Sequence, residues 1–406
     1  MNVLIIGEYF PPDLGGAATR ASNVAKGLSL NGCNVTVVTA FPHYPTGKIP
    51  KEYKHKLLKV EYVGKSRVIR TFVLPLESKG FFNRLLLFGS FMLSSLFALP
   101  IVGKIDVIWA ANPNVLVLVP SIAYGSVKRK HIVSNVDDLV LEDLYDLNFV
   151  QKGSAISRLV EFCAKVLFAK IKAVTPISPG YIEPISKEYC VDENRIHVVR
   201  SGVDLSIFVM DQARCQDKER FNILYVGVLG VGYDFDQIIN AAEIVAKSDS
   251  NIQFIIHGAG ESAQYLKDTI KNRKLPNLTL IDRILSSRKE VVDLMNTADV
   301  LILPMKSFGR PYLGIATKLY EYQAIGKPII CCGDGEQAKY IEETNSGIVV
   351  KPGDYKAIAS TVIYLSKNPN LANRLGKNGR NYVVNKLSLN AIGLEMKVIL
   401  KNLTNT

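Results

Sequence analysis

The sequence lacks the cysteine spacing of a disulfide-rich or zinc-binding protein. Its 406 residues include six cysteines and five histidines, and no two cysteines form a Cys-x-x-Cys pair. Disulfide frameworks and structural zinc sites depend on such spacing. We therefore expect a protein of the reducing cytoplasm, with free thiols, no bound metal and no other cofactor.

Long runs of one charge are also absent, although the net charge of +12 is high. No basic helix or aromatic–basic motif of the kind that binds nucleic acid is present, so we expect no nucleic acid partner. The densest basic region, 51–84, has nine Lys or Arg against three Glu. Such an excess favours anionic partners such as nucleotide phosphates and lipid headgroups.

A recognisable signal sequence is missing, because the first apolar run ends at Gly7 after only a few residues. One other segment, 85–102, has eighteen residues without a charge, which is close to the length of a membrane span. It contains Gly89, Pro100 and three serines. We expect a helix that is buried in the first domain or lies on a membrane surface; a true span is the alternative.

Apolar runs alternate with helix-length segments along the whole chain, which predicts an α/β fold. The length exceeds one ordinary core, so we expect two doubly wound, Rossmann-like domains at 1–205 and 206–387, joined by a polar linker at 211–220. Each would have a parallel sheet covered on both faces, and the loops at the carboxyl ends of the strands would line a cleft between the domains. A last helix is expected at 388–403. The expected strands are Val3–Ile6, Asn34–Ala40, Val68–Leu74, Asp106–Ala111, His131–Val136, Ala173–Ser178 and Ile196–Arg200, then Ile223–Gly227, Ile252–Gly258, Leu278–Ile281, Val300–Leu303, Ile329–Cys332 and Ile348–Val350.

The stretch 311–328 combines a cation, a carboxylate and a helix start between two apolar runs. We expect Thr317 to cap a helix that begins at Lys318 and Gly326 to end it. A helix N-terminus attracts anions, and Lys318 adds a positive charge there. One turn further, Glu321 can accept hydrogen bonds from two hydroxyl groups. This combination suits a nucleotide diphosphate, with the phosphates at Lys318 and the ribose at Glu321.

The run from Gly314 to Pro328 also resembles the donor-site signature of the retaining glycosyltransferases of family 4. It is closest to the subgroup of fucosaminyl- and other N-acetylhexosaminyltransferases, which writes G-x-P-S-K-x-x-E-Y-x-A-x-G-x-P. The resemblance implies the GT-B fold, in which two Rossmann-like domains face each other across a cleft and the last helix packs on the first domain. It also implies that Gly314, Lys318 and Glu321 bind a nucleotide-sugar donor.

Two loops of the first domain resemble loops of the same subgroup. The stretch from Tyr9 to Arg20 is similar to the loop that faces the donor phosphates and the acceptor. Its Gly15 and Gly16 lack a Cβ, so the backbone can approach a ligand closely. The loop from Phe41 to Lys48 resembles F-P-N-Y-P-x-G-K. The resemblance assigns Arg20 and His43 to the acceptor side; His43 replaces an asparagine, so we do not expect it to act as a base.

The stretch 135–143 supplies the candidate catalytic carboxylates. It follows an expected strand and resembles the subgroup's R-D-L-W-P-E-S, with Asp138 and Glu142 at the acidic positions. Asp137 stands where many relatives carry a histidine. A carboxylate here can orient the acceptor hydroxyl or the donor sugar, or take a proton if burial raises its pKa.

The second domain contributes glycines to the expected site. Gly227 and Gly230 end its first strand and let the backbone reach a pyrophosphate. Gly258 and Gly260 resemble the family's G-x-G-E loop beside the nucleotide base. They also fit a dinucleotide fingerprint, but this follows the second strand of its domain rather than the first.

The sequence departs from the wider family at three positions. The usual Arg is missing at Val228, the usual Lys is missing near Tyr233, and the first Glu of the E-x7-E motif is replaced at Leu313. The positive charge for the phosphates must then come from Lys318, followed by Arg283 or Arg310.

These observations predict a retaining glycosyltransferase of the hexosyltransferase class. The donor would be a UDP-N-acetylhexosamine-type sugar, or, as second choice, GDP-mannose. The helix dipole and Lys318 would stabilise the leaving diphosphate without a metal. No carboxylate stands out as a nucleophile, so front-face substitution is favoured, with the leaving phosphate helping to take the acceptor proton.

The regions 51–84 and 85–102 predict docking at the cytoplasmic face of the cell membrane. The partners would be an anionic membrane surface and a lipid-linked acceptor glycan, in the synthesis of a cell-surface polysaccharide or a glycoprotein glycan. Two alternatives stay open: a non-hydrolysing nucleotide-sugar epimerase, and a catalytically inactive scaffold that binds glycan or lipid.

Overall fold

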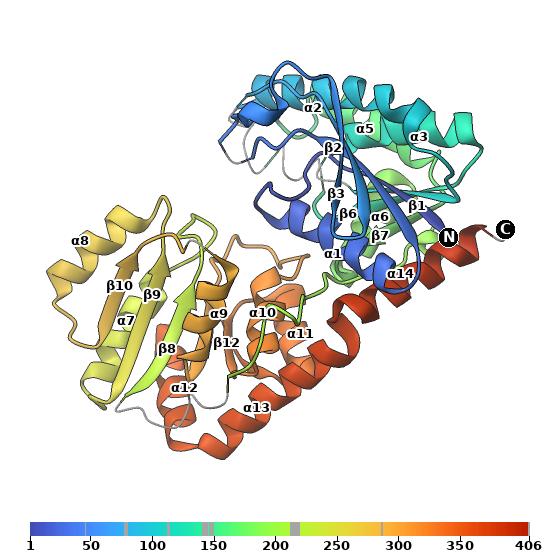
Figure 1. Ribbon diagram of the computed structural model, residues 1–406. Helices are drawn as coiled ribbons and strands as arrows, with labels where there is room; N and C mark the ends of the chain where they lie inside the picture. The colour runs from blue at the N-terminus through green and yellow to red at the C-terminus, as the bar shows by residue number, and fades with distance from the viewer. Residues whose placement is uncertain are drawn as a thin grey trace. The chain divides into compact units, whose positions relative to one another are not determined.

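The computed structural model describes residues 1–44, 46–76, 80–111, 114–139, 145, 150–211, 220–285 and 287–404. The chain forms two compact units (Figure 1). Unit 1 comprises Met1–Gly202 together with Leu389–Thr406, and unit 2 comprises Val203–Ser388. Each unit is built on one largely parallel sheet with helices packed on it, so the predicted α/β class and the two Rossmann-like domains are confirmed. The expected linker, 211–220, lies largely outside the described residues.

The sheet of unit 1 has the strand order β3-β4-β2-β1-β5-β6-β7. Neighbouring strands are parallel except β3 and β4, which are antiparallel. The central β1 is apolar and buried on both faces from Val3 to Ile6. The chain turns back across the sheet between β1 and β5, which makes their carboxyl ends the topological switch point where α/β proteins bind ligands. The strands are β1 (Asn2–Ile6), β2 (Asn34–Ala40), β3 (Leu58–Val63), β4 (Ser66–Thr71), β5 (Val107–Ala110), β6 (Ile132–Val136) and β7 (Ala173–Pro176).

Helices cover both faces of this sheet. The last helix of the chain packs on α1 through two glycines: a Cβ on Gly393 would lie 2.1 Å from the carbonyl carbon of Gly27. The absence of side chains at these positions therefore lets the two helix backbones approach closely. The helices are α1 (Gly16–Leu30), α2 (Phe81–Ser95), α3 (Leu118–Lys128), α5 (Ala155–Phe168), α6 (Ile182–Tyr189) and α14 (Leu389–Thr404), with short 3-10 turns η1 (Lys51–Tyr53), η2 (Leu96–Ile101), η3 (Val115–Val117), η4 (Pro179–Tyr181) and η5 (Glu193–Arg195).

Unit 1 differs from the sequence prediction at two strands. The strand expected at 196–200 is wrong, because beside β7 this segment makes an isolated bridge between Ile196 and Val174 and does not form a continuous strand. The backbone N–H groups of His197 and Val199 donate to carbonyls of β7. The carbonyls of Val199 and Arg200 accept hydrogen bonds from the Arg20 side chain instead of a neighbouring strand. Conversely, β3 was missed; it is a partly exposed edge strand without a continuous apolar run.

The basic region 51–84 is only partly a charged surface. Its Arg70 is fully buried, and its guanidinium donates to Glu61 and to the carbonyls of Ala40 and Pro11. Arg70 is therefore part of the packing of unit 1.

The apolar segment 85–102 forms α2 and η2. By length and composition alone, Phe82–Ile101 can cross a membrane, and 28% of it is buried. One face, with Leu87 and Phe91, packs into unit 1, while Leu93 and Phe97 are exposed. The expectation of a helix buried in the domain is thus correct for one face only.

The sheet of unit 2 is parallel throughout, with the order β10-β9-β8-β11-β12-β13. All six strands predicted in this part are confirmed within a few residues. The switch point lies between β8 and β11. The elements are β8 (Phe221–Val226), α7 (Asp236–Ala246), β9 (Ile252–Gly258), α8 (Ala263–Arg273), β10 (Leu278–Asp282), α9 (Arg288–Asn296), β11 (Val300–Pro304), α10 (Thr317–Ile325), β12 (Ile329–Cys332), α11 (Gly335–Thr344), β13 (Gly347–Val350), α12 (Tyr355–Lys367), α13 (Pro369–Tyr382) and the π-helical turn η7 (Val383–Leu387).

Candidate active site

The start of α10 lies beside the loop that follows β8. A Cβ on Gly227 would lie 2.3 Å from Lys318 Cε and 2.5 Å from Lys318 Nζ. The ammonium group also lies 5.5 Å and 5.9 Å from the ring centroids of Tyr233 and Tyr225, within the range of cation–π attraction. In the described part of the chain, no carboxylate forms an ion pair with Lys318. Gly227 therefore makes room for a cation whose charge is available to a ligand.

The first turn of α10 is also available to an anion. The helix begins at Thr317 rather than Lys318, with Ala316 as N-cap and no side chain capping the turn. The predicted Thr317 cap is therefore wrong: Thr317 is already helical, and a cap must precede the first helical residue. Gly314 lies in the bend just before Ala316. The predicted end is confirmed, since Gly326 is left-handed with a φ of 75°. Unclaimed N–H groups at a helix start are a ready anion site.

Glu321 lies one turn into α10 and already has a partner. Arg288 Nη1 donates to Glu321 Oε1 at 2.8 Å, and the side chains of Arg288 and Glu321 are 51% and 15% exposed. One oxygen of the carboxylate, Oε2, has no hydrogen bond in the described structure. Arg288 could not be recognised from the sequence, because it lies on α9 and meets Glu321 only in the folded unit.

Gly258 and Gly260 allow the loops after β8 and β9 to touch backbone to backbone. A Cβ on Gly258 would lie 1.7 Å from the carbonyl oxygen of Gly227, and one on Gly260 would lie 2.5 Å from that of Leu229. These two glycines thus shape the carboxyl edge of the sheet. Gly230 has no such crowding, with only Val228 near it.

Arg283 follows β10, and its side chain is 66% exposed. Its Nη2 lies 3.8 Å from Glu290 Oε2.

In unit 1, the buried Arg20 lies beside the partly exposed Asp137 at the carboxyl edge. Arg20 Nη1 donates to the carbonyl of Arg200 at 2.7 Å, and Nη2 to that of Val199 at 2.5 Å. Arg20 Nε lies 3.8 Å from Asp137 Oδ1. Because Arg20 is only 3% exposed, the structure places it behind Asp137 rather than on an open acceptor surface.

Asp137 has the properties of a proton acceptor near neutral pH. Asn135 Nδ2 donates to its Oδ1 at 2.7 Å. Burial raises the pKa of Asp137 to about 6, against the opposing effects of the Arg20 charge and the Asn135 hydrogen bond. A carboxylate with such a pKa is mostly ionised at pH 7 yet basic enough to take a proton. Asp138 is exposed, and Glu142 lies outside the described residues.

His43 belongs to a buried cluster that joins the loops after β1 and β2. Its Nε2 lies 3.6 Å from Glu8 Oε1, and both side chains are almost fully buried. Asp13 Oδ1 accepts hydrogen bonds from the backbone N–H groups of His43 and Tyr44, both at 2.8 Å. Burial raises the pKa of Glu8; burial alone lowers that of His43, but the facing Glu8 raises it overall. His43 thus helps to hold the two loops together. The sequence did not point to Glu8 or Asp13.

The hydrogen bonds between Asp13 and the loop after β2 also bring Tyr44 close to the glycines at the start of α1. Gly15 has a φ of 105°, and a Cβ there would lie 3.3 Å from Tyr44 Cε1, whereas Gly16 is uncrowded. No side chain caps α1, so its first turn offers N–H groups to an anion, as in α10.

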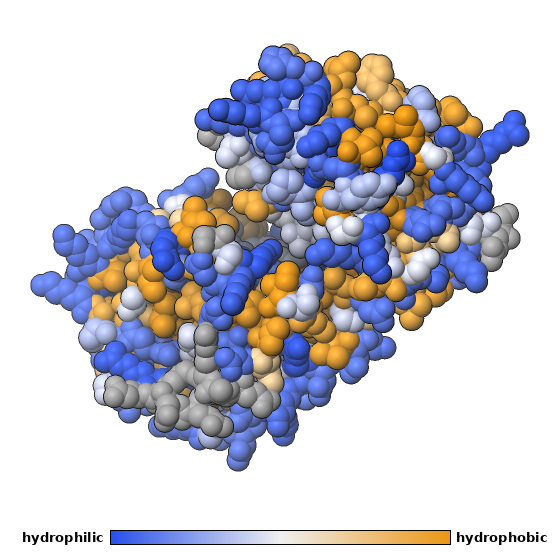
Figure 2. All heavy atoms as spheres, in the orientation of Figure 1, coloured by the Kyte–Doolittle hydropathy of each residue, from blue (hydrophilic) through white to orange (hydrophobic). Residues whose placement is uncertain are grey.

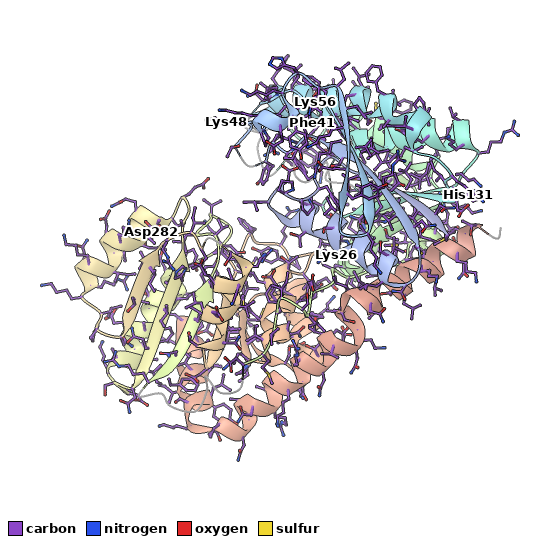
Figure 3. All side chains as sticks on the ribbon, viewed as in Figure 1. Lys26, Phe41, Lys48, Lys56, His131 and Asp282 are labelled. Atoms are coloured by element: carbon purple, nitrogen blue, oxygen red, sulfur yellow. The ribbon has the colours of Figure 1, made fainter. Side chains whose placement is uncertain are left out.

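The predicted site residues therefore gather at two carboxyl edges. Those of unit 1 include Gly15, Gly16 and Asp137, and those of unit 2 include Gly227, Gly258 and Lys318. In Figure 3, Phe41, at the carboxyl end of the sheet of unit 1, lies far from His131, at the amino end. A cavity of about 540 Å³ lies at that amino end and contains none of the predicted site residues.

Comparisons with known proteins cover nearly the whole chain. Residues 14–207 match the family described as Glycosyltransferase Family 4, and residues 210–382 match Glycosyl transferases group 1. The capsular polysaccharide biosynthesis glycosyltransferase CapM of Staphylococcus aureus is 24% identical over 254 residues, which are 60% of this chain and 63% of CapM. WcaI of Escherichia coli, named for colanic acid biosynthesis, is 23% identical over 388 residues, 89% of this chain and 91% of WcaI.

Solved structures of glycosyltransferases share the fold over its full length. Sucrose-phosphate synthase from Thermosynechococcus elongatus has a TM-score of 0.73 at 16% identity, covering 100% of this chain and 99% of its own. Anabaena HepE in complex with UDP has a TM-score of 0.69 at 14% identity, and the match covers 99% of this chain and 100% of HepE. With both halves of the sequence matched and this fold throughout, the chain belongs to the glycosyltransferases of family 4, enzymes with the GT-B fold.

Proposed function

We propose that this enzyme transfers a sugar from a UDP-sugar to a lipid-linked acceptor glycan in the synthesis of a bacterial surface polysaccharide, with retention of configuration. The named relatives act in capsular polysaccharide and colanic acid biosynthesis, and HepE was solved with UDP and with UDP-glucose. An N-acetylhexosamine-type sugar is our first choice, from the donor motif, and GDP-mannose the second.

The observation that carries this proposal is Lys318 at the uncapped start of α10. The ammonium group lies against Gly227, and no side chain caps the first turn of the helix. The N–H of Leu319 donates to the carbonyl of Ala316, so the N–H groups of Thr317 and Lys318 are those left for an anion in the described structure. A diphosphate bound there would meet a positive charge and a helix dipole at the point where negative charge develops as the sugar leaves. Glu321, one turn further, would accept from the ribose hydroxyls through the oxygen that Arg288 leaves free.

Phosphate binding at Lys318 would be helped by a further cation of unit 2. Arg283 is an exposed cation on the loop after β10. With these groups the leaving diphosphate needs no metal ion, and we propose that none is used.

Asp137 is the residue that we assign to the acceptor proton. Front-face substitution lets the leaving phosphate help, but a carboxylate with a raised pKa beside the reacting hydroxyl can share that proton. Arg20 and Asn135 hold the carboxylate in place. The site thus favours an enzyme over the scaffold alternative, because a base has no use in binding alone.

The pH dependence of the reaction tests this role. We expect kcat/KM for the acceptor to fall about tenfold per pH unit below pH 6, because Asp137 is protonated there and cannot accept a proton. Asp137→Asn should lower the rate and remove this acidic limb, while Asp138→Asn keeps it. An unchanged acidic limb in Asp137→Asn would assign the titration to another group.

A thermal-shift panel tests the donor class. The panel contains UDP, GDP, TDP, NAD and the corresponding sugars. A ligand that binds only the folded state stabilises it by about 2.7 kcal/mol at 100 times its Kd. We expect UDP and UDP-sugars to raise the unfolding temperature by several degrees, with no effect of NAD. A rise with NAD alone, or with no nucleotide at all, would refute the proposed reaction.

We also propose that the enzyme works at the cytoplasmic face of the membrane as a peripheral protein, because its proposed acceptor is anchored in lipid. The net charge of +12 supports contact with an anionic surface.

A further inference from the structure

Three helices of unit 1 share one face of its sheet and end at the same edge. Figure 1 shows α2, α3 and α5 together on one side of the strands, with α1 and α14 on the other side. Each helix leads into the next parallel strand, β5, β6 or β7. Because a crossover helix runs antiparallel to its strands, all three helices end at the amino edge of the sheet, away from the candidate active site.

The outward face of α5 is apolar and uncovered. Ile156, Leu159, Phe162 and Val166 follow each other at helical spacing and are exposed, from 45% at Val166 to 65% at Phe162. The opposite face, with Ala164 and Phe168, packs into unit 1. A surface helix of a soluble protein normally turns polar residues outward, so this stripe needs a partner.

The neighbouring helices continue the apolar surface. Leu93 on α2, Phe97 and Ile101 on η2, and Val127 on α3 are exposed near the carboxyl ends of these elements. In Figure 2, hydrophobic side chains gather over the part of unit 1 where α2, α3 and α5 lie. Contiguous apolar surface of this kind marks a site of interaction with a protein or a membrane.

Basic residues border this surface where the helices end. Each of the three connections from helix to strand is basic: Lys104 precedes β5, Lys128, Arg129 and Lys130 precede β6, and Lys170 and Lys172 precede β7. No ion pair involves these six residues within the described chain. Charge of one sign is thus repeated at three separate turns that the topology brings to one edge.

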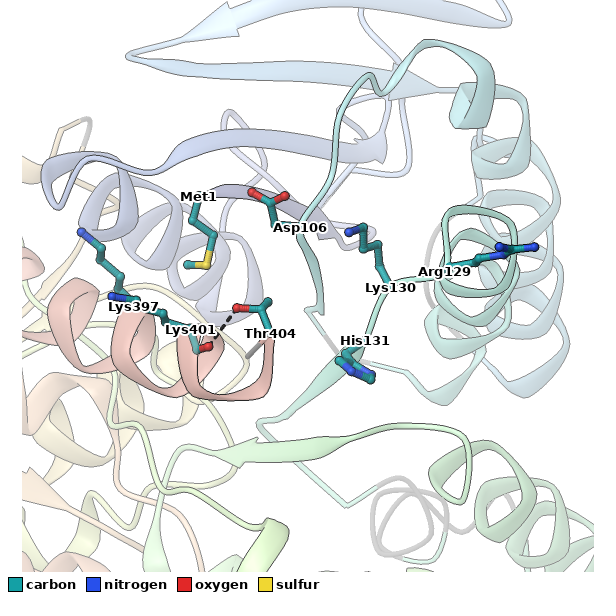
Figure 4. Close-up of a pocket in the computed structure, with 8 residues that line it drawn as sticks. All are labelled: Met1, Asp106, Arg129, Lys130, His131, Lys397, Lys401 and Thr404. Atoms are coloured by element: carbon teal, nitrogen blue, oxygen red, sulfur yellow. Dashed lines mark hydrogen bonds between the residues drawn. The ribbon is translucent and has the colours of Figure 1, made fainter. Parts of the chain in front are cut away.

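A cavity at this edge extends the positive border to α14. It is lined by Arg129, Lys130, Lys397 and Lys401, together with Met1 and His131 (Figure 4). Among the described lining residues the one carboxylate is Asp106, and it already accepts two hydrogen bonds from Asn2. The edge therefore faces solvent with a large excess of positive charge.

We propose that the outer face of α2, α3 and α5, with the basic residues at its edge, docks on an anionic lipid surface. The apolar side chains would enter the boundary between headgroups and acyl chains, while the lysines and arginines contact the headgroups. A protein partner would not need three basic turns bordering an apolar face, whereas a membrane attracts both features at once. The inference rests on the proposed lipid-linked acceptor, which the docked enzyme would meet at the membrane.

Vesicle co-sedimentation of the full chain tests the docking surface. We expect binding to vesicles of phosphatidylcholine with phosphatidylglycerol, much weaker binding to phosphatidylcholine alone, and weakening by salt. The double substitution Leu159→Ser with Phe162→Ser should reduce binding about tenfold, because it removes two apolar side chains from the interface. Its control is Leu394→Ser with Val398→Ser, an exposed apolar pair on α14 at the other face.

A second pair of variants tests the charges. Lys128→Gln with Lys130→Gln should lower binding to the anionic vesicles about thirtyfold, at about 1 kcal/mol per basic residue near the surface. Lys356→Gln with Lys377→Gln in unit 2 changes net charge equally and should have little effect. Unchanged binding in both α5 and Lys128/Lys130 variants would overturn the proposal.

Two further readouts separate this proposal from its alternatives. If sedimentation equilibrium shows a dimer that Leu159→Ser with Phe162→Ser makes monomeric, the face binds a second copy and the lipid proposal is wrong. UDP thermal shifts should be the same in all these variants. If the protein binds vesicles through this face but does not bind UDP, the proposed reaction is wrong and the proposed docking surface is still supported.

Discussion

Lys318→Ala should lower kcat/KM for the UDP-sugar by a factor of about 10²–10³, the usual effect of removing one group that stabilises developing charge. The variant should also lose most of its thermal shift with UDP. The physical reason is that Lys318 supplies a positive charge at the start of α10, against Gly227. Steady-state kinetics with donor in excess and thermal shift with UDP measure the two effects.

Two controls make the Lys318 result specific. Lys339→Ala on α11 removes an exposed lysine that pairs only with Glu336 and should leave both measurements unchanged. Lys318→Arg should rescue only part of the activity, since a guanidinium is bulkier than the ammonium that fits against Gly227. Full activity in Lys318→Ala would remove Lys318 from the donor site and, with it, the main support for the proposed function.

Arg20→Ala should strongly destabilise unit 1. It leaves the carbonyls of Val199 and Arg200 and the carboxylate of Asp137 without their buried partner. Breaking one side of a buried ion pair costs about 3–5 kcal/mol, which lowers the unfolding temperature of a unit of this size by about 10 °C. Calorimetry, which resolves the two units if they unfold separately, measures the shift.

The same substitution should also change the pH profile. Without the Arg20 charge, which lowers the pKa of Asp137, the acidic limb of kcat/KM should move to higher pH. A purely structural role of Arg20 would leave the limb where it is. Arg158→Ala, an exposed arginine on α5, is the control for stability and should change the unfolding temperature by no more than a degree or two.

The candidate site was only partly readable from the sequence. The glycines, Lys318, Glu321 and Asp137 could be proposed from the sequence, because close backbone approach and charge at a helix start have local signatures. Glu8 and Arg288 were missed, because each is recognised only by its partner in the fold. Glu8 lies beside His43 and Arg288 donates to Glu321, and each partner is more than thirty residues away in the sequence. Arg20 was identified, but its burial was not, because an arginine in a sequence carries no mark of what surrounds it.

By itself, the sequence determined the two α/β units, almost all their strands, the end of α10 at Gly326 and the family. These follow from apolar periodicity, glycine positions and local motifs, which act over a few residues. Only the tertiary structure decided that α10 begins at Thr317 without a side-chain cap, that Arg20 supports Asp137 and that the apolar stripe of α5 faces outward. Such features depend on which elements pack together, and an apolar helical stripe looks the same in a sequence whether the fold buries it or leaves it exposed.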